Sequence, residues 1–154
     1  WDDLGSQGGP QISPDLYRSM VKPFHKELYQ AVKKNSSLFL FMHSCGSVYD
    51  LIPDLIDCGV DILNPVQFSA AKMDSNNLKE EFGDKITFWG GGVDTQYTLP
   101  FGSVEDVSRQ VEEQIKIFSR GGGYVFAAVH NIQANVPDKD IVLMNDAIKE
   151  FNGK

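Results

Sequence analysis

Four short apolar runs, each followed by an amphipathic segment, constrain the fold of this chain more than any other feature. The runs lie at residues 38–43, 60–64, 85–89 and 124–128 and show no helical gap, which is typical of strands buried on both faces. The segments between and after them carry apolar residues three and four positions apart, the spacing of a helix with one buried side. Strands that alternate with helices in this way predict a parallel sheet, so we expect an α/β fold.

A helix is also expected ahead of the first strand. Ser13 followed by Pro14 combines a helix cap with proline at the first helical position, and the helical pattern runs to about Lys34. Pro23 lies inside this pattern and should kink or break the helix. The stripe expected to face the core consists of Leu16, Met20, Phe24, Leu28 and Ala31.

Two architectures fit four strand–helix units: an open doubly wound sheet and part of a (β/α) barrel. No G-x-G-x-x-G motif follows the first strand, which weakens a dinucleotide-binding sheet. Four units are half of the eight in a TIM-type barrel, and the polar residues concentrate where strands end, as the working face of a barrel requires. These features favour part of a barrel, and residues 1–154 are enough for a single domain with its own core.

The composition excludes some partners. Acidic residues outnumber basic ones 21 to 14, giving a net charge of -7, which argues against nucleic acid or an anionic membrane as the main partner. No apolar run approaches the roughly 20 residues of a membrane span. With two cysteines, no visible signal peptide and a first residue that is Trp1, we expect a cytoplasmic protein that is processed or is a piece of a longer chain.

The first strand ends in His43 and Cys45, two residues of metal-binding type. Side chains two positions apart on a strand point to the same face, so these two should project together while Ser44 points away. A neutral imidazole and a thiolate are both good zinc ligands. The spacing alone leaves open a simpler alternative, a polar pair at a strand end in which the cysteine packs as a small apolar residue.

Polar residues also follow the other three strands. Asn64 and Gln67 come after the second, although turn chemistry around Pro65 would explain Asn64 equally well. His130 ends the fourth strand in the same relative place as His43 ends the first. We expect a substrate to be bound by Asn64, Gln67, Asp94, Gln96 and Gln133. The pair Asp2 and Asp3 lies either in a solvated loop or over the mouth of the barrel.

The motifs "HSCGSV", "LNPVQ", "WGGGVDTQ" and "GGGYVFAAVHNIQANVP", together with the first 28 residues, resemble the uroporphyrinogen decarboxylase superfamily. The resemblance covers nearly the whole chain and is greatest for the corrinoid-dependent methyltransferase branch. It implies a (β/α)8 barrel of roughly twice this length, of which this chain is the C-terminal half.

In the methyltransferase branch, an H-x-C motif supplies two ligands of a catalytic zinc, and His43 and Cys45 match it. The third ligand is usually a cysteine after the last strand, and His130 occupies that place here. The resemblance thus implies metal ligands at His43, Cys45 and His130, and methyl transfer between a corrinoid protein and a thiol or folate-type acceptor. His130 also matches the histidine with which decarboxylases contact a substrate carboxylate, and the resemblance implies a catalytic role for it. Uroporphyrinogen decarboxylation, or an inactive fragment of either enzyme, is the alternative.

Half a barrel leaves two open sheet edges and an inner face that is expected to carry Phe39, Phe41, Ile62 and Phe88. Open edges and apolar faces of that size are rarely left exposed in a soluble monomer. We therefore expect this chain to be covered either by a missing N-terminal half or by a second copy of itself.

Overall fold

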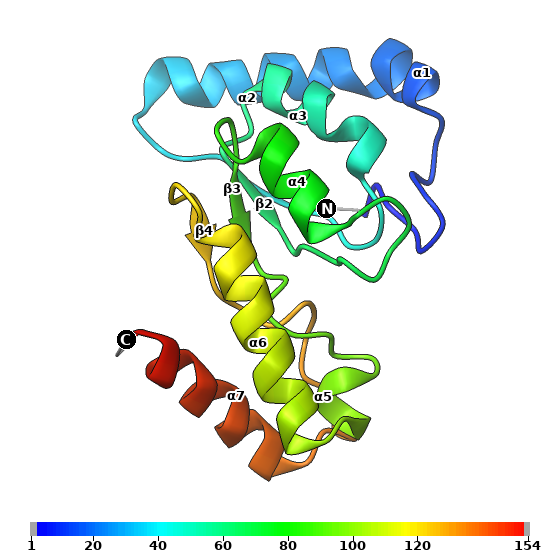
Figure 1. Ribbon diagram of the computed structural model, residues 1–154. Coiled ribbons are helices and arrows are strands. Elements are labelled where there is room, and N and C mark those ends of the chain that lie inside the picture. Colours follow the sequence, from blue (N-terminus) through cyan, green and yellow to red (C-terminus); the bar gives the residue numbers. More distant parts are fainter. Residues whose placement is uncertain (1–2, 153–154) are drawn as a thin grey trace.

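Four parallel strands follow one another across a single sheet in the computed structural model, which describes residues 3–152 (Figure 1). Each strand pairs with the next along the chain, for example His43 with Asn64 and Leu63 with Phe88. The helices are α1 (Pro14–Leu16), the π-helical turn η1 (Tyr17–Val21), α2 (Lys22–Asn35), the 3₁₀ turn η2 (Tyr49–Leu51), α3 (Ile52–Cys58), α4 (Ser75–Phe82), α5 (Thr98–Phe101), α6 (Val104–Phe118) and α7 (Asp138–Asn152). The strands are β1 (Phe41–His43), β2 (Ile62–Asn64), β3 (Thr87–Trp89) and β4 (Tyr124–Val125).

The strand order confirms the predicted architecture. A doubly wound sheet reverses its strand order at a switch point, whereas the order here is β1-β2-β3-β4 without reversal. All three pairings are parallel. The strands are shorter than predicted: β1, β2 and β3 comprise only the last three residues of their predicted runs, whereas β4 comprises the first two residues of its run. Consecutive parallel units of this kind are what part of a (β/α)8 barrel contains.

The two faces of the sheet differ sharply in what covers them. Met42, Leu63 and Phe88 lie next to one another on the face toward the helices and are at most 7% exposed. On the opposite face, Phe41 and Trp89 pack edge to face with ring centroids 5.4 Å apart and remain partly open to solvent. The prediction that Phe88 lines the inner face was wrong, because the alternation of β3 places Trp89 there and Phe88 in the helix-covered core.

The first helix corrects a second expectation. Its stripe was expected to face the core, but Leu16, Met20, Phe24 and Leu28 are 43–71% exposed and Ala31 is exposed too. The helix instead packs through the neighbouring stripe, which contains the fully buried Tyr17 and the partly buried Val21, His25 and Tyr29. Both stripes are largely apolar, so periodicity alone did not distinguish them.

Pro23 interrupts the first helix as predicted. The chain makes the π-helical turn η1 just before the proline, and α2 then begins with Pro23 in its first turn. Proline is tolerated in that position because the first backbone N–H groups of a helix have no partner within the helix.

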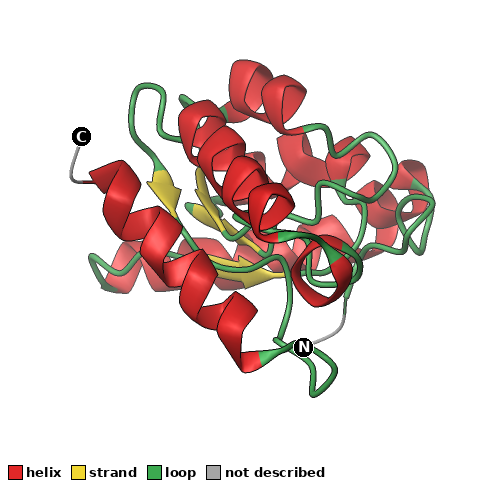
Figure 2. Ribbon diagram, turned by 60° about the horizontal axis from the view of Figure 1, so that its bottom comes forward, coloured by secondary structure: helices red, strands yellow, loops and turns green. Residues whose placement is uncertain are grey.

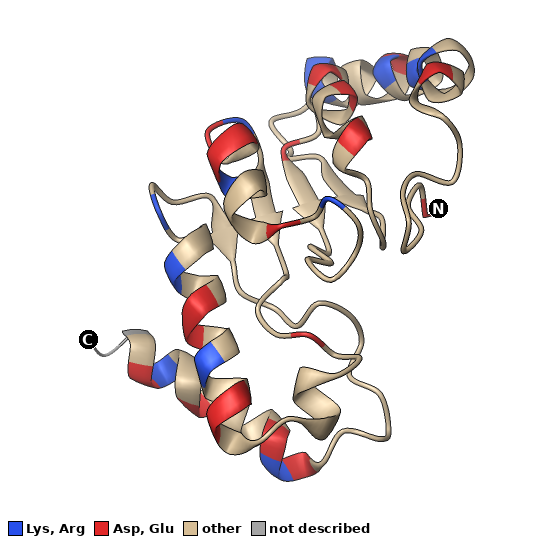
Figure 3. Ribbon diagram, turned by 45° about the vertical axis from the view of Figure 1, so that its right-hand side comes forward, with Lys and Arg blue, Asp and Glu red and all other residues tan. Residues whose placement is uncertain are grey.

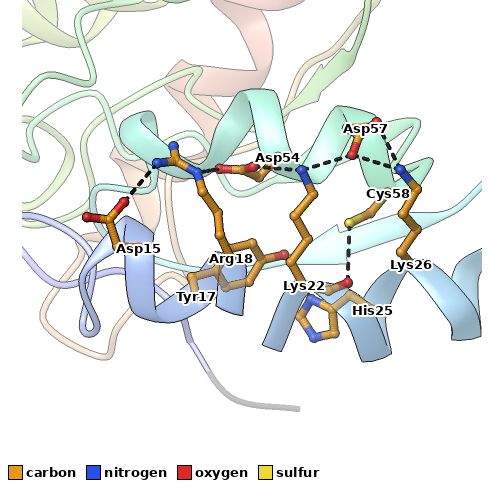
Figure 4. A network of polar contacts seen from close by, with 9 residues as sticks. All are labelled: Asp15, Tyr17, Arg18, Lys22, His25, Lys26, Asp54, Asp57 and Cys58. Carbon is orange, nitrogen blue, oxygen red and sulfur yellow. Dashed lines mark hydrogen bonds and ion pairs between the residues drawn. The ribbon is translucent and has the colours of Figure 1, made fainter. Parts of the chain in front are cut away.

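A ladder of ion pairs fixes the first helix against α3 (Figure 4). Asp54 accepts from Arg18 Nε at 2.9 Å and from Lys22 Nζ at 2.8 Å. Asp57 lies 2.8 Å from Lys22 Nζ and 3.0 Å from Lys26 Nζ. The hydrogen bonds from Lys22 and Lys26 hold the pKa of Asp57 below its usual value. The pair between Lys26 and Asp57 is exposed and contributes little stability, whereas the pairs to Asp54 meet a buried carboxylate and fix the register of the two helices.

A second, smaller core joins α5, α6 and α7. Val107, Val111 and Met144 belong to it, and α6 and α7 lie side by side (Figure 1, Figure 2). A capping box opens α6, in which the Ser103 hydroxyl accepts from the Asp106 N–H and the Asp106 carboxylate accepts from the Ser103 N–H. None of the helices within residues 3–152 combines the length and apolar character needed to cross a bilayer.

Candidate functional site

The loops that follow the four strands meet at one end of the sheet, which we call the mouth. The mouth comprises residues 44–48, 65–70, 90–97 and 126–133. It contains a cavity of about 450 Å³, which the segment around Gly5 also lines. The predicted site residues that line this cavity are Cys45, Gln67, Gln96, His130 and Gln133. The cavity thus brings together predicted side chains from the loops after all four strands.

A second cavity of about 260 Å³ adjoins the first across the loop that follows β4. His43 and Asn64 line it on one side, and Val129, His130 and Asn131 on the other. His130 is exposed and borders both cavities. Its position lets it contact a ligand in either one, and its predicted catalytic role stays a prediction.

His43, Cys45 and Asp3 form a cluster at this end of β1. One ligand atom from each lies within 4.8 Å of the other two. The Cys45 Sγ is 3.6 Å from the His43 Nε2, so the two side chains project together as the strand spacing predicted. Ser44 is fully buried on the other side. Imidazole, thiolate and carboxylate are the three side-chain groups that bind zinc in proteins.

Asp3 reaches the cluster because the N-terminal segment docks onto the loop after β1. The Cys45 N–H donates to Asp3 Oδ1 at 2.7 Å, and the Leu4 N–H donates to the Ser44 hydroxyl at 2.9 Å. Gly5 permits this approach, since a Cβ at that position would lie 2.4 Å from the Cys45 carbonyl oxygen. From the sequence, the pair Asp2 and Asp3 could lie either in a solvated loop or over the mouth. Asp3 lies at the mouth, and Asp2 is outside the described residues.

Two glutamines connect the segment to the neighbouring loops. Gln67 Oε1 accepts from the Gly46 N–H at 2.9 Å, and Gln67 Nε2 donates to Gln7 Oε1 at 2.8 Å. Gln7 Nε2 in turn donates to the Ser69 carbonyl at 3.1 Å. Gln67 therefore holds the mouth together, and both ends of its amide already have partners. Its predicted contact with a substrate stays a prediction.

The Cys45 thiol is protonated more readily than an ordinary cysteine in this setting. Partial burial raises the pKa of Cys45, and the nearby negative charge of Asp3 raises it further. Both effects disfavour a bare thiolate. A divalent cation between the two residues would reverse them, because its charge would stabilise the thiolate and the carboxylate together.

Asp94 plays a local role in the loop after β3. Its Oδ1 accepts from the Gln96 N–H at 3.0 Å and from the Tyr97 N–H at 2.6 Å, which closes a turn. The residue is buried, and its Oδ2 has no hydrogen-bond partner among the described residues. Gln96 lines the larger of the two cavities, whereas Asp94 is not among the residues that line it. Substrate binding by either stays a prediction.

The cluster that could hold a metal contains Asp3 where the prediction has His130. Among the described residues, Asp3 lies beside His43 and Cys45, and His130 is not part of that cluster. Metal binding by His130 therefore stays a prediction. The prediction considered only residues at strand ends and so could not identify Asp3. Asp3 lies 40 residues before His43 in the sequence and reaches the cluster only because its segment docks on the mouth.

Comparisons with known proteins agree with this architecture. Residues 2–151 match the family model described as uroporphyrinogen decarboxylase. Curated relatives named uroporphyrinogen decarboxylase include one from Chlorobium phaeobacteroides, 23% identical over 93% of this chain and 40% of that protein, and one from Chlorobaculum tepidum, 22% identical with the same coverage. A solved methyltransferase from Methanosarcina mazei superimposes with a TM-score of 0.68 and 24% identity, covering 92% of this chain and 38% of the other.

These matches span nearly all of the present chain. The chain itself spans about 40% of the length of the curated relatives that it matches. The match of the family model over residues 2–151 decides the assignment. The chain belongs to the uroporphyrinogen decarboxylase family.

Proposed function

We propose that this chain contributes a zinc-binding half-site to a methyltransferase that moves a methyl group between a corrinoid protein and a thiol or folate-type acceptor. The observation that carries the proposal is the cluster of Asp3, His43 and Cys45 at the mouth of the parallel sheet. The name of the similar solved structure, a methyltransferase, supports the same reaction class.

The cluster fits zinc in its donor set and in its spacing. Nitrogen and sulfur ligands bonded to one zinc at about 2.0–2.3 Å in tetrahedral geometry lie roughly 3.6 Å apart. The His43 Nε2 and the Cys45 Sγ are 3.6 Å apart. Three protein ligands would leave one position open, which is the pattern of catalytic rather than structural zinc sites. Bound there, the ion would lower the pKa of an acceptor thiol so that it reacts as a thiolate.

The residues of this chain would bind the acceptor and take up its proton. A methylated corrinoid would supply the methyl group as substrate: the acceptor sulfur would bond to the methyl carbon, the electron pair of the broken cobalt–carbon bond would stay on cobalt, and the thiol proton would be released. His130 borders both cavities, which supports our assignment of this histidine as the group that would receive that proton. Gln96 and Gln133 line the larger cavity and would orient the polar part of the acceptor.

Uroporphyrinogen decarboxylation is the second candidate, and the names of the curated relatives favour it. Its substrate is a polycarboxylated tetrapyrrole, which calls for several cationic side chains. None of the described residues lining the two cavities is Lys or Arg. Figure 3 shows the Lys and Arg residues of the chain mainly on the helices. This half of the site therefore suits a neutral polar ligand better than a polyanion.

We also propose that the chain does not form the complete site alone. Within residues 3–152, β1 and β4 are the open edges of the sheet. The stripe Leu16, Met20, Phe24 and Leu28 is exposed on the helix that precedes β1. Either the remainder of a longer protein or a second copy of the chain would cover both surfaces.

The first experiment measures bound zinc by elemental analysis after purification in zinc-containing medium. We expect about one equivalent in the wild-type protein, little in Cys45→Ser, and a reduced amount in Asp3→Asn. Cys58→Ser is the matched control, because Cys58 is buried in α3 and lies outside the cluster. Equal zinc in wild type and Cys45→Ser would refute the metal site, and loss of zinc in His130→Ala would make His130 the third ligand in place of Asp3.

The second experiment tests the reaction in the longest form of the protein that its gene encodes. Incubation with methylcobalamin and a series of thiols should yield the methyl thioether and demethylated cobalamin, in amounts that fall with Cys45→Ser. Decarboxylation of uroporphyrinogen without demethylation of the cobalamin would favour the second candidate.

A further inference from the structure

The His43 ring is held from the side opposite Cys45 by a residue of the neighbouring strand. Asn64 is the partner of His43 in the register of β1 and β2. Its Oδ1 lies 2.8 Å from the His43 Nδ1, while the His43 Nε2 faces the Cys45 Sγ at 3.6 Å. The two ring nitrogens therefore have different neighbours, and the chemistry of those neighbours decides which nitrogen carries the hydrogen.

The orientation of the Asn64 amide follows from a third residue. Asn64 Nδ2 donates to the Trp89 carbonyl oxygen at 3.0 Å. A carbonyl oxygen only accepts, so the NH₂ group of the amide must face Trp89 and its oxygen must face His43. That oxygen also only accepts, so the His43 Nδ1 must carry the hydrogen. In the neutral ring, the lone pair then lies on Nε2, on the side of Cys45.

We infer that Asn64 is a positioning residue that holds His43 in its Nδ1–H tautomer and thereby presents Nε2 as the ligating atom. Metal-binding histidines commonly donate their other ring N–H to such a partner, which fixes both tautomer and ring orientation. The tautomer follows from hydrogen bonds alone, and only the consequence for metal binding rests on the proposed function. This role differs from the substrate contact expected for Asn64 from its sequence position.

Three variants separate this role from a general effect on the mouth. Asn64→Leu has a similar shape but removes the acceptor, whereas Asn64→Asp keeps an oxygen opposite Nδ1. Asn131→Leu is the matched control, because Asn131 lines the same cavity as His43 and its side chain has no hydrogen bond among the described residues. Unchanged far-ultraviolet circular dichroism and melting temperature would establish that each variant folds.

The decisive measurement is a nitrogen NMR spectrum of the metal-free protein labelled with ¹⁵N-histidine, recorded about two pH units above the ordinary histidine pKa of about 6.5. The chain has three histidines, so loss of one set of signals in His43→Gln assigns the ring. We expect the Nδ1–H pattern in wild type, Asn64→Asp and Asn131→Leu. In Asn64→Leu the spectrum should shift toward the Nε2–H tautomer, which free histidine prefers.

An Nε2–H ring in the wild-type protein would overturn the inference, as would an Nδ1–H ring that persists unchanged in Asn64→Leu. For zinc affinity, measured by competition with a chelating dye, loss of this outer partner should cost roughly 10–100-fold in Asn64→Leu, with recovery in Asn64→Asp. Absence of zinc binding in the wild-type protein would refute the proposed function alone, and the NMR result would still decide the role of Asn64.

Discussion

Replacement of Phe24 by serine tests whether the exposed stripe of the first helix is an association surface. Phe24 lies in the middle of the stripe formed with Leu16, Met20 and Leu28, and 71% of it is exposed. Because so little of its surface contributes to the core, Phe24→Ser should leave the folding free energy of the chain within about 0.5 kcal/mol of wild type.

The effect on association should be much larger. Full burial of a phenylalanine side chain is worth about 1.5–3 kcal/mol. The exposed 71% of Phe24 would therefore contribute about 1–2 kcal/mol when a partner covers it. A symmetric dimer buries the Phe24 side chain of both chains. The substitution should therefore weaken self-association by about 2–4 kcal/mol, which is roughly 30- to 800-fold in Kd.

Sedimentation equilibrium over a wide range of concentrations measures this constant directly. Phe101→Ser is a close control, since Phe101 is 73% exposed but belongs to α5, far along the chain from the open edge at β1. We expect association in the wild-type chain, a marked loss in Phe24→Ser, and little change in Phe101→Ser.

Two results would refute the reasoning. A wild-type chain that sediments as a folded monomer at all concentrations would show that the stripe needs no cover. An equal loss of association in both variants would show nonspecific adhesion between apolar surfaces and not a defined contact.

The remaining predictions concern pH and the approach of the N-terminal segment. Burial lowers the pKa of His25 below its ordinary value of 6.5, so the unfolded chain binds more protons than the folded one as the pH falls below 6.5. The free energy of unfolding, measured with urea, should therefore decrease as the pH is lowered below 6.5, and this decrease should be smaller in His25→Gln. Gly5→Ala should lower zinc affinity at least about tenfold, because its Cβ would press on the Cys45 carbonyl and displace Asp3. Gly8→Ala, where a Cβ would meet nothing within 4 Å, should bind zinc like wild type in the same chelator competition.

The alternation of apolar runs and helical segments was enough to predict the parallel sheet and the order of its units. It also placed His43 and Cys45 on one side of a strand end, because a period of two residues is a property of the strand itself. The strand ends were harder to predict: the regular part of β4 covers only Tyr124–Val125, and pairing depends on neighbours that the run itself does not specify.

Features that depend on what packs against a surface were not predictable from periodicity. The first helix has two adjacent apolar stripes, and the one with Tyr17 packs inward because it meets α3, where Asp54 and Asp57 also pair with the helix. Asp3 was missing from the predicted metal ligands for a related reason. Its approach to Cys45 depends on backbone contacts of a segment without regular periodicity, and on a glycine that leaves room for them.

The cluster draws its members from two parts of the chain. His43 and Cys45 belong to the end of β1, whereas Asp3 belongs to residues 3–10, which dock on the mouth through bonds such as that from the Ser47 N–H to the Ser6 carbonyl. A cation bound by all three would hold the segment closed, and an open segment would release it more easily. The fraction of protein with a bound cation and the resistance of residues 3–10 to proteases would then increase together. Limited proteolysis would therefore report the cation occupancy of the cluster.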